Sequence, residues 1–573
     1  MNNKEVSSRL GRMAQMLEFA DENTFKIKAY QRAARNIQAL QDDINIINET
    51  GEIDNIPGVG KAIGGKIEEM LATGTFEAYE RLARETPVDL EGLLGIMGIG
   101  PKTIRMFYRH LGITNVDKLR QAAEDHRIRR LPRMGVIREE NILHAIKRSQ
   151  QEGLMGRTPL GLALPVAEEI RDTLLDDAKV RTARIVGSIR RRKDTVGDID
   201  IIAATDDPDD VMRSFVTMEK VTDVLAEGTT KSSVIYDGNL QVDLRIVPDE
   251  SFGSLMQHFT GSKEHNVRLR QLALSKGMKL SEYGLTNMAT GKLYPCRTEE
   301  DEYSGLGLEF IPPELREDRG EVEASQRGQL PDLVTLADIR GDLHVHSTWS
   351  DGRHSIEEMA AAAYALGYEY IAVCDHSPST VVGGGLSGKQ VLQKLEEIDR
   401  VNEQYDDFRV LSGTECDIRA DGSLDYGSDI LSRLDIVVVG VHSGFAQDGH
   451  TMTKRIISAL NNPYVDILAH PTGRLLGKRP GYELDMHAVL NAAQENNVVL
   501  EINASPLRLD LNDIHSRWAK DKGILLSVNT DAHSTKTLSY MRFGIDVARR
   551  AWLEAGDVLN TWPLAKLCDR LDI

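Results

Sequence analysis

The sequence predicts a multidomain protein with an all-helical N-terminal part, an α+β middle part and a C-terminal barrel of seven βα units. At 573 residues, the chain is too long for one hydrophobic core. Residues 1–150 carry apolar side chains at helical spacing, and strand-like alternation begins near Arg184. Beyond residue 338, seven short runs of Val, Ile and Leu alternate with helical patterns, which is typical of buried parallel strands.

The composition is that of an ordinary soluble globular protein, with 41% hydrophobic and 27% charged residues. The net charge of −19 disfavours a nucleic-acid partner at first sight. The acidity is uneven, however, because residues 1–150 hold 23 basic and 21 acidic side chains, whereas residues 331–573 hold 23 basic and 35 acidic ones. Bound cations would neutralise part of that acidity. A DNA partner is therefore compatible with the composition.

The cysteines and the N-terminus indicate a cytoplasmic protein. The four cysteines, Cys296, Cys374, Cys416 and Cys568, show no CxxC spacing and suggest a reducing compartment. No apolar run approaches the length of a membrane span, and the first residues are polar. We therefore expect no membrane partner and no disulfide framework.

In the helical part, two copies of a Gly-x-Gly turn lie 40 residues apart, each before a predicted helix with a nearby lysine. The residues are Gly58, Gly60 and Lys61 in the first copy, and Gly98, Gly100 and Lys102 in the second. Such a turn exposes backbone N–H groups where a phosphate can bind. The pattern resembles the helix-hairpin-helix motif, which grips the DNA backbone without reading sequence. Plain connections between helices also use Gly-x-Gly, but the second copy favours phosphate binding.

The middle part combines a phosphate-binding turn with three aspartates. The turn, Gly187–Arg191, runs from a predicted strand into Gly-Ser and a basic stretch. Asp198 and Asp200 then share one face of a strand, because side chains alternate along a strand. Two carboxylates that close repel each other unless cations lie between them, and Asp243 on another alternating run supplies a third. The set predicts a two-metal site for phosphoryl or nucleotidyl transfer; the alternative is a solvated edge strand.

Acidic and imidazole side chains end strand after strand in the predicted barrel. They are His344 with His346, His376, Glu415, His442, His470, Glu501, and Asp531 with His533. The active site of a βα barrel forms at the carboxyl ends of its strands. One such residue would be an ordinary buried polar group, but barrel packing does not require one at every strand. Histidines with carboxylates suit Mn²⁺, Zn²⁺ or Fe²⁺, so the sequence predicts a metallohydrolase.

Together, these motifs resemble a family X DNA polymerase followed by a polymerase and histidinol phosphatase (PHP) domain. The polymerase resemblance rests on Gly187-Ser-Ile-Arg-Arg191, Gly197-Asp-Ile-Asp200, Val242-Asp-Leu-Arg245 and Phe259-Thr-Gly-Ser262. The PHP resemblance rests on the histidines and acidic residues of the barrel, together with Asp351. The two cover essentially the whole chain, and their order is similar to that of bacterial polymerases X.

The resemblance implies five segments. They are a lyase-like helical domain (1–85), a second helical DNA-binding domain (86–153), a nucleotidyltransferase-type palm with a nucleotide-binding subdomain (154–315), a linker (316–335) and a distorted (β/α)7 PHP barrel (336–573). The linker is predicted because the stretch after Pro312 is polar and lacks apolar periodicity.

The resemblance also implies a role for each motif residue in the polymerase part. Asp198, Asp200 and Asp243 would hold two Mg²⁺ or Mn²⁺ ions. The incoming nucleotide would be bound by Gly187, Ser188, Arg191, Phe259, Gly261, Asn266 and Arg270, with Lys263 adding positive charge. His258 stands where many members of the family carry Tyr, which puts discrimination against ribonucleotides in doubt. Lys66 matches the position of the lyase nucleophile, but a lysine that merely contacts phosphate has the same sequence context.

For the barrel, the resemblance implies up to three Mn²⁺, Zn²⁺ or Fe²⁺ ions. Their ligands would be His344, His346, Asp351, His376, Glu415, His442, His470, Asp531 and His533.

The function implied is a monomeric DNA-repair polymerase that fills short gaps in base excision repair. Its substrates would be gapped or nicked duplex DNA and dNTPs, and the barrel would supply a 3′→5′ exonuclease and an abasic-site endonuclease. One alternative is a phosphomonoesterase barrel, similar to histidinol phosphatase, with a helical DNA-targeting arm. Another is a DNA-binding scaffold in which both catalytic centres have decayed.

Overall fold

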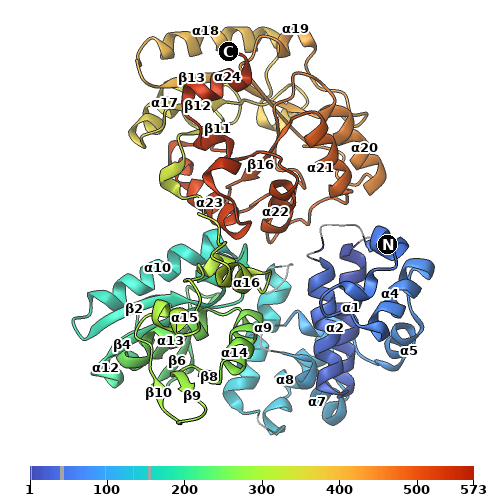
Figure 1. Ribbon diagram of the computed structural model, residues 1–573, viewed down its shortest axis with the longest axis vertical. Coiled ribbons are helices and arrows are strands. Elements are labelled where there is room, and N and C mark those ends of the chain that lie inside the picture. The colour runs from blue at the N-terminus through green and yellow to red at the C-terminus, as the bar shows by residue number, and fades with distance from the viewer. Residues whose placement is uncertain (2, 39, 41–43, 97–98, 133, 153–156) are drawn as a thin grey trace. The chain divides into compact units, whose positions relative to one another are not determined.

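The structure is a computed structural model that describes residues 1, 3–38, 40, 44–96, 99–132, 134–152 and 157–573. These residues form two compact units, 1–156 and 157–573, both drawn in Figure 1. No helix in these described ranges is both long and apolar enough to cross a lipid bilayer.

The N-terminal unit is all-helical in its described residues, as predicted. Its helices are α1 (Asn3–Ala20), α2 (Thr24–Gln38), α3 (Ile44–Glu49), α4 (Lys61–Thr73), α5 (Glu77–Glu85), α6 (Leu90–Leu94), α7 (Pro101–Leu111), α8 (Val116–Glu124) and α9 (Val136–Glu152). In α1, Leu10, Met13 and Leu17 recur at helical spacing and are buried in one apolar cluster with α2 and α4. A second cluster joins α6, α7, α8 and α9.

The second unit begins with a five-stranded sheet in the order β2–β4–β7–β6–β5. The strands are β2 (Val180–Val186), β4 (Ile199–Thr205), β5 (Val221–Ala226), β6 (Lys231–Tyr236) and β7 (Leu240–Ile246), with a small ribbon of β1 (Thr158–Pro159) and β3 (Thr195–Val196) beside them. The helices here are α10 (Leu160–Asp176), α11 (Gly187–Arg190) and α12 (Pro208–Val216). Strands β4 and β7 are parallel, and their register places Asp200 beside Asp243. The predicted α+β character of this part is confirmed.

A smaller subdomain follows the sheet. It contains α13 (Phe252–Thr260), α14 (Lys263–Ser275), β8 (Met278–Ser281), β9 (Gly284–Asn287), β10 (Leu293–Tyr294), α15 (Glu299–Gly305) and α16 (Glu321–Gln326). Its three strands form an antiparallel sheet in the order β10–β9–β8.

The segment 316–335, which the sequence predicts to be a linker, contains α16 and packs against this subdomain. Arg316 is fully buried and donates to Glu299 at 2.5 Å. Glu321 is also buried and lies 2.7 Å from Nδ1 of His265. The segment also buries Val322 and Leu333, but because charged groups are buried beside them it shows no clear apolar periodicity even though it is packed.

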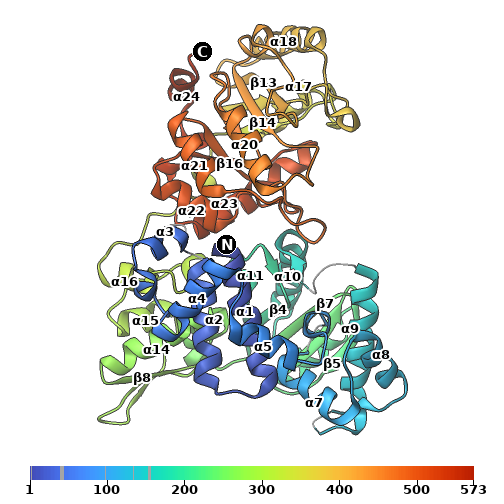
Figure 2. The same cartoon turned by 90° about the vertical axis from the view of Figure 1, so that its right-hand side faces the viewer.

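The last part of the chain is a barrel of seven parallel strands in sequence order. The strands are β11 (Gly341–Val345), β12 (Tyr370–Val373), β13 (Arg409–Asp417), β14 (Ile436–Gly440), β15 (Ile467–Leu468), β16 (Val499–Asn503) and β17 (Leu526–Asn529). The helices are α17 (Ile356–Ala365), α18 (Gly388–Asn402), α19 (Ser428–Leu431), α20 (Gly449–Leu460), α21 (Met486–Glu495), α22 (Asp513–Asp521), α23 (Met541–Arg550) and α24 (Leu564–Leu571). A bridge between Val345 and Ala532 nearly closes the barrel. Figure 2 shows helices such as α17, α18 and α20 around the strands. Each of the seven predicted runs overlaps one of these strands.

The five-stranded sheet and the barrel share one continuous apolar cluster. Leu160 and Ala163 of α10 belong to it, as do Leu509 and Leu511 of the barrel. At Gly161 the approach is so close that a Cβ would lie 2.0 Å from Cβ of Pro506, so the start of α10 packs directly on the barrel.

One buried carboxyl group makes the stability of this fold depend on pH. Burial raises the pKa of Glu302, on α15, from 4.5 to about 8. Between these two values the folded chain keeps a proton that the unfolded chain has lost, so the free energy of unfolding falls as the pH rises. We expect Glu302→Gln, which cannot ionise, to reduce this fall in differential scanning calorimetry across the same pH range. Glu300→Gln, exposed on the same helix, is the control; a pH dependence unchanged by Glu302→Gln contradicts the prediction.

Candidate active sites

The barrel brings histidine and carboxylate side chains together at the carboxyl ends of its strands. Three groups of side chains can be defined, and within each group the possible ligand atoms all lie within 4.8 Å of one another. They are His346, Asp351, His376 and His533; His344, His346, Glu415 and Asp531; and His376, Glu415 and His442. The predicted ligand His470 is outside these groups, but its Nε2 lies 2.8 Å from Glu415.

Glu415, which is almost fully buried on β13, connects the groups. Its Oε1 lies 2.9 Å from Nε2 of His442 and 2.8 Å from Nε2 of His470. Its Oε2 lies 3.0 Å from Nδ1 of His376. Because each oxygen faces different histidines, this one carboxylate is placed to bridge two cations.

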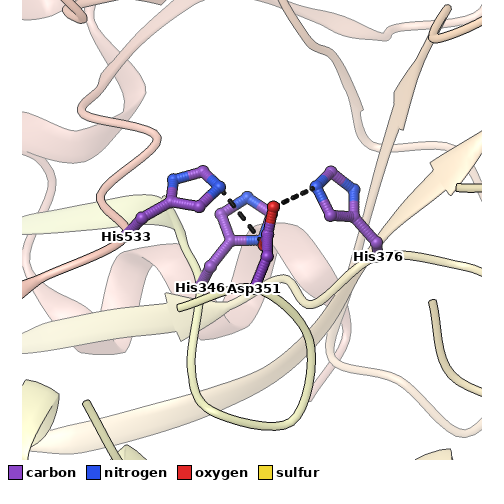
Figure 3. Close-up of side chains that lie close together, drawn as sticks. All are labelled: His346, Asp351, His376 and His533. Carbon is purple, nitrogen blue, oxygen red and sulfur yellow. Dashed lines mark ion pairs between the residues drawn. The ribbon is translucent and has the colours of Figure 1, made fainter. Parts of the chain in front are cut away.

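Asp351, which is partly exposed, also lies between two histidines of the cluster. Figure 3 shows its carboxylate between His376 and His533, with His346 behind it. Its Oδ2 lies 3.5 Å from Nε2 of His376, and its Oδ1 lies 3.3 Å from Nε2 of His533. This residue comes from the loop after β11, where it had no strand pattern to identify it.

The ring orientations fit metal binding. Nδ1 of His344 lies 2.8 Å from Glu501, so Nδ1–H donates to the carboxylate, and in the neutral ring this leaves a lone pair on Nε2. This Nε2 lies only 3.2 Å from Nε2 of His346. Two imidazole lone pairs at that distance repel each other unless a cation or a proton lies between them.

The pKa values show how strongly the carboxylates attract positive charge here. Burial alone would lower the pKa of His376, but Glu415 and Asp351 raise it to about 10. In the same way, Glu415 and Asp417 raise the pKa of His442 to about 9 against the effect of burial. These are the places where bound cations would replace protons.

Glu501, like His470, is a strand-end residue outside the three ligand groups. It is fully buried and accepts from the backbone N–H of His470 at 2.8 Å and from Asn529 at 3.1 Å, as well as facing His344. It therefore orients two histidines instead of joining the cluster. Its position at a strand end was visible in the sequence, but that position could not separate a ligand from a carboxylate that supports one.

The three aspartates of the palm, the five-stranded sheet domain, are electrostatically coupled. Burial raises the pKa of Asp200 to about 7, and Asp198 and Asp243 add to this rise. Asp243 differs: although burial acts to raise its pKa, the ammonium group of Lys231, 2.6 Å away, lowers it. Among the described residues, every group of three or more possible metal ligands within 4.8 Å of one another lies in the barrel. The three aspartates of the palm therefore do not form such a group. Cations between these carboxylates would offset their mutual repulsion.

The predicted phosphate turn lies directly against these aspartates. Gly187 has a φ of +70°, and a Cβ there would lie 2.6 Å from Oδ2 of Asp200. Only glycine permits both the backbone conformation and this close approach. Ser188 follows in α11 and is half-buried. The guanidinium group of Arg191 donates to the carbonyl of Thr260 and lies 3.2 Å from Glu317.

The other predicted nucleotide-binding residues gather at the end of α13 and the start of α14. Gly261, with a φ of +71°, lies against Arg191, because a Cβ there would be 3.2 Å from the guanidinium nitrogen. Asn266 is buried and donates to the carbonyl of His258 at 2.8 Å. Arg270 lies 3.2 Å from Nδ1 of His258.

Two further nucleotide-binding candidates lie in the same region. The ring of Phe259 packs under the guanidinium group of Arg245 at 4.6 Å, which holds the ring in place. Lys263 is exposed at the first position of α14.

The helical unit presents two helix N-termini of the predicted kind. Gly60 precedes α4 and Gly100 precedes α7, and neither start has a side-chain cap, whereas Asp89 and Asn115 cap α6 and α8. Uncapped N–H groups are available to a phosphate. Gly58 has a φ of +81°, while Lys61 and Lys102 lie in the first turns of their helices. Gly98 lies outside the described residues.

Lys66 lies on α4 one turn after these N–H groups. Its ammonium group donates to the carbonyl of Ala62 at 2.7 Å, and its side chain is half-buried. Such a position suits a phosphate contact, so its role as a lyase nucleophile stays a prediction.

Comparisons with known proteins agree with this architecture. Four family models match: a helix-hairpin-helix domain (residues 1–76), a SAM-like helix-hairpin-helix tandem (90–148), a DNA polymerase beta thumb (255–317) and a PHP domain (342–505). The chain is 39% identical over 562 residues to the DNA polymerase/3′-5′ exonuclease PolX of Bacillus subtilis, covering 98% of this chain and 97% of that protein. The chain belongs to the PolX group of family X DNA polymerases.

Partial matches to other proteins agree with this membership. DNA polymerase lambda of Rattus norvegicus is 25% identical over 312 residues, which is 50% of this chain and 52% of that protein. A probable phosphatase of Thermoanaerobacter sp. is 31% identical over 231 residues, 38% of this chain and 89% of that protein. A phosphatase barrel with a DNA-targeting arm would not account for the full-length PolX match. The chain is therefore a DNA polymerase with a PHP domain, and its helix-hairpin-helix and thumb domains imply DNA binding.

The contact between Gly187 and Asp200 yields a prediction for this PolX-type polymerase. In Gly187→Ala the added methyl group must displace Asp200, so we expect the single-turnover rate of primer extension to fall at least about 10-fold. The matched control is Gly238→Ala, in the turn between β6 and β7, which has a similar φ of +76° but no atom near its Cβ within the described structure. Equal losses in the two variants would mean that backbone strain, and not the contact with Asp200, limits the rate.

Proposed function

We propose that this chain fills short gaps in duplex DNA with dNTPs at the site formed by Asp198, Asp200 and Asp243. The observation that carries the proposal is the coupling of these three carboxylates directly beneath the Gly187 turn. Buried, mutually repelling carboxylates beside a turn that can bind phosphate suit a site for a triphosphate and divalent cations. Mg²⁺ or Mn²⁺ would supply the charge that neutralises the phosphates and activates the primer hydroxyl group.

The chain's own residues position the nucleotide in this proposal. The N–H groups and hydroxyl of Gly187 and Ser188 donate to the leaving phosphates, and Arg191 binds them with its guanidinium group. The 3′-oxygen of the primer forms the new bond to the α-phosphorus while the bond to pyrophosphate breaks. Asn266 and Arg270, both fixed by His258, would contact the base and the template strand. With His258 in place of the tyrosine common in the family, this pocket lacks the side chain that the resemblance links to discrimination against ribonucleotides.

We propose that the barrel removes nucleotides from DNA 3′ ends, a 3′→5′ exonuclease that also cleaves at abasic sites. Its three overlapping donor groups match the number of ions expected in a PHP site, and mixed histidine and carboxylate donors favour Mn²⁺, Zn²⁺ or Fe²⁺. Such ions supply Lewis acidity towards a phosphodiester. Glu415 connects the donor groups, and Glu501 fixes the tautomer of His344. The positively charged guanidinium group of Arg508 lies at the edge of the site, 3.6 Å from Asp531.

In this proposal the uncapped starts of α4 and α7 hold the DNA backbone next to a gap or nick. Lys66, on α4, would act on an incised abasic sugar. The protein would work as a monomer in base excision repair in the bacterial cytoplasm, a setting that agrees with its PolX relationship.

Separate sites predict separable activities. Asp243→Ala should lower primer extension on one-nucleotide-gapped DNA at least about 100-fold and leave 3′ nucleotide removal unchanged, because it alters one carboxylate cluster only. His344→Ala should have the opposite effect. The controls are Asp209→Ala on α12 and His450→Ala on α20, both exposed. If either test variant loses both activities while its unfolding temperature is normal, the two-site proposal is wrong.

The hairpin proposal predicts a specific effect on DNA affinity. In Gly60→Val the new Cβ meets no heavy atom of the described structure within 4 Å, so we expect the fold to hold while the branched side chain covers the N–H groups at the start of α4. We expect Kd for gapped DNA to rise at least about 5-fold, and the affinity of wild type to fall steeply with salt. Gly11→Val, in an equally open position on α1, is the control. Unchanged Kd for Gly60→Val would make this turn a plain helix connector.

A further inference from the structure

A buried arginine of the barrel reaches the phosphate turn of the palm. Arg550, the last residue of α23, is almost fully buried. Its guanidinium group donates to the backbone carbonyl of Arg191 at 2.6 Å. Arg191 ends the turn that approaches Asp200, so one side chain of the barrel is hydrogen-bonded to the backbone of the proposed polymerase site.

The same guanidinium group is held by two carboxylates. It donates to Glu317 at 3.1 Å and to Asp513 of α22 at 2.6 Å. Burial alone would raise the pKa of Glu317, but Arg550, Lys193 and Arg191 lower it to about 2, so its charge is present at every pH of interest. A buried guanidinium group with all three of these contacts is held in place, because on moving away its own buried charge would lose these partners.

Glu317 is shared between Arg550 and Arg191. The same oxygen, Oε1, lies 3.1 Å from Arg550 and 3.2 Å from Nε of Arg191. If Arg191 turns towards a triphosphate, it gives up this ion pair. Arg550 then remains beside Glu317 and keeps its buried charge compensated, which makes the movement of Arg191 less costly.

We propose that Arg550 is a positioning residue of the polymerase, which holds the backbone of the phosphate turn and keeps Glu317 paired when Arg191 binds the incoming nucleotide. The proposal rests on the proposed phosphate-binding role of Arg191. It makes the PHP domain a structural part of the nucleotide site, independently of any nuclease chemistry in the barrel.

The competing explanation is that Arg550 only attaches the barrel to the palm. Another arginine of the same helix provides the matched control. Arg542 pairs with Glu168 of α10 at 3.3 Å and so links α23 to the palm without touching the turn. An attachment role predicts similar effects for both arginines, whereas a positioning role predicts an effect on nucleotide binding for Arg550 alone.

The experiment measures primer extension on one-nucleotide-gapped DNA with full-length Arg550→Met, Arg550→Lys and Arg542→Met. We expect Arg550→Met to raise KM for the dNTP at least about 10-fold with a much smaller change in kcat. Arg550→Lys keeps the charge but not the planar fork, so it should raise KM less, and it also serves if the Met variant fails to fold. Arg542→Met should leave KM unchanged. Removal of 3′ nucleotides by each variant reports whether the barrel is intact.

Arg191→Met and the double variant separate this proposal from the one on which it rests. If Arg191 binds the nucleotide, Arg191→Met raises KM. Adding Arg550→Met to the Arg191→Met variant should then raise KM by a smaller factor than Arg550→Met does in the wild type. An unchanged KM for Arg191→Met refutes the role of Arg191 itself. If Arg191→Met raises KM, two outcomes overturn the role of Arg550. One is a wild-type KM for both Arg550 variants; the other is an equal effect of Arg542→Met and Arg550→Met.

Discussion

Buried negative charge is the constraint on which both candidate centres of this protein depend. A carboxylate in a low-dielectric interior is stable only beside a positive group or a cation. In the barrel, histidines surround Glu415 and hold protons at the places where metal ions would bind. In the palm, Lys231 pairs with Asp243, while burial and the neighbouring aspartates raise the pKa of Asp200. Where palm and barrel meet, arginines compensate Glu317 and Asp513. The same physical requirement thus links catalysis, metal affinity and domain packing.

Much of this arrangement could be predicted from the sequence, because strand periodicity fixes where side chains point. Asp200 and Asp243 lie side by side in parallel strands, and the barrel histidines gather because parallel strands end at one rim. Glycines with positive φ, such as Gly187, were also recognisable, since a Gly-Ser turn before a basic stretch has few other uses.

What could not be predicted are contacts made by charged residues across long sequence separations. The polarity of segment 316–335 predicts a linker, yet Arg316 and Glu321 are buried in their subdomain. Hydrophobic periodicity does not detect buried ion pairs such as that between Arg316 and Glu299. Likewise, no local pattern connects Arg191 with Glu317 or Arg550, which lie far away in sequence. Glu501 was visible at its strand end, but its place behind His344 depends on the side-chain geometry of the folded barrel.

The shared carboxylate of Glu317 has a thermodynamic consequence for the two halves of the enzyme. If nucleotide binding draws Arg191 away from Glu317, the contact between Glu317 and the barrel's Arg550 changes at the same time. Coupling of this kind is reciprocal in binding free energy: whatever the barrel contributes to nucleotide affinity, the bound nucleotide contributes equally to the contact between palm and barrel. The coupling needs no direct path between the two candidate metal sites, because both domains act on one buried charge. A PolX-type enzyme could in this way keep its palm and PHP domain joined most firmly while a nucleotide is bound.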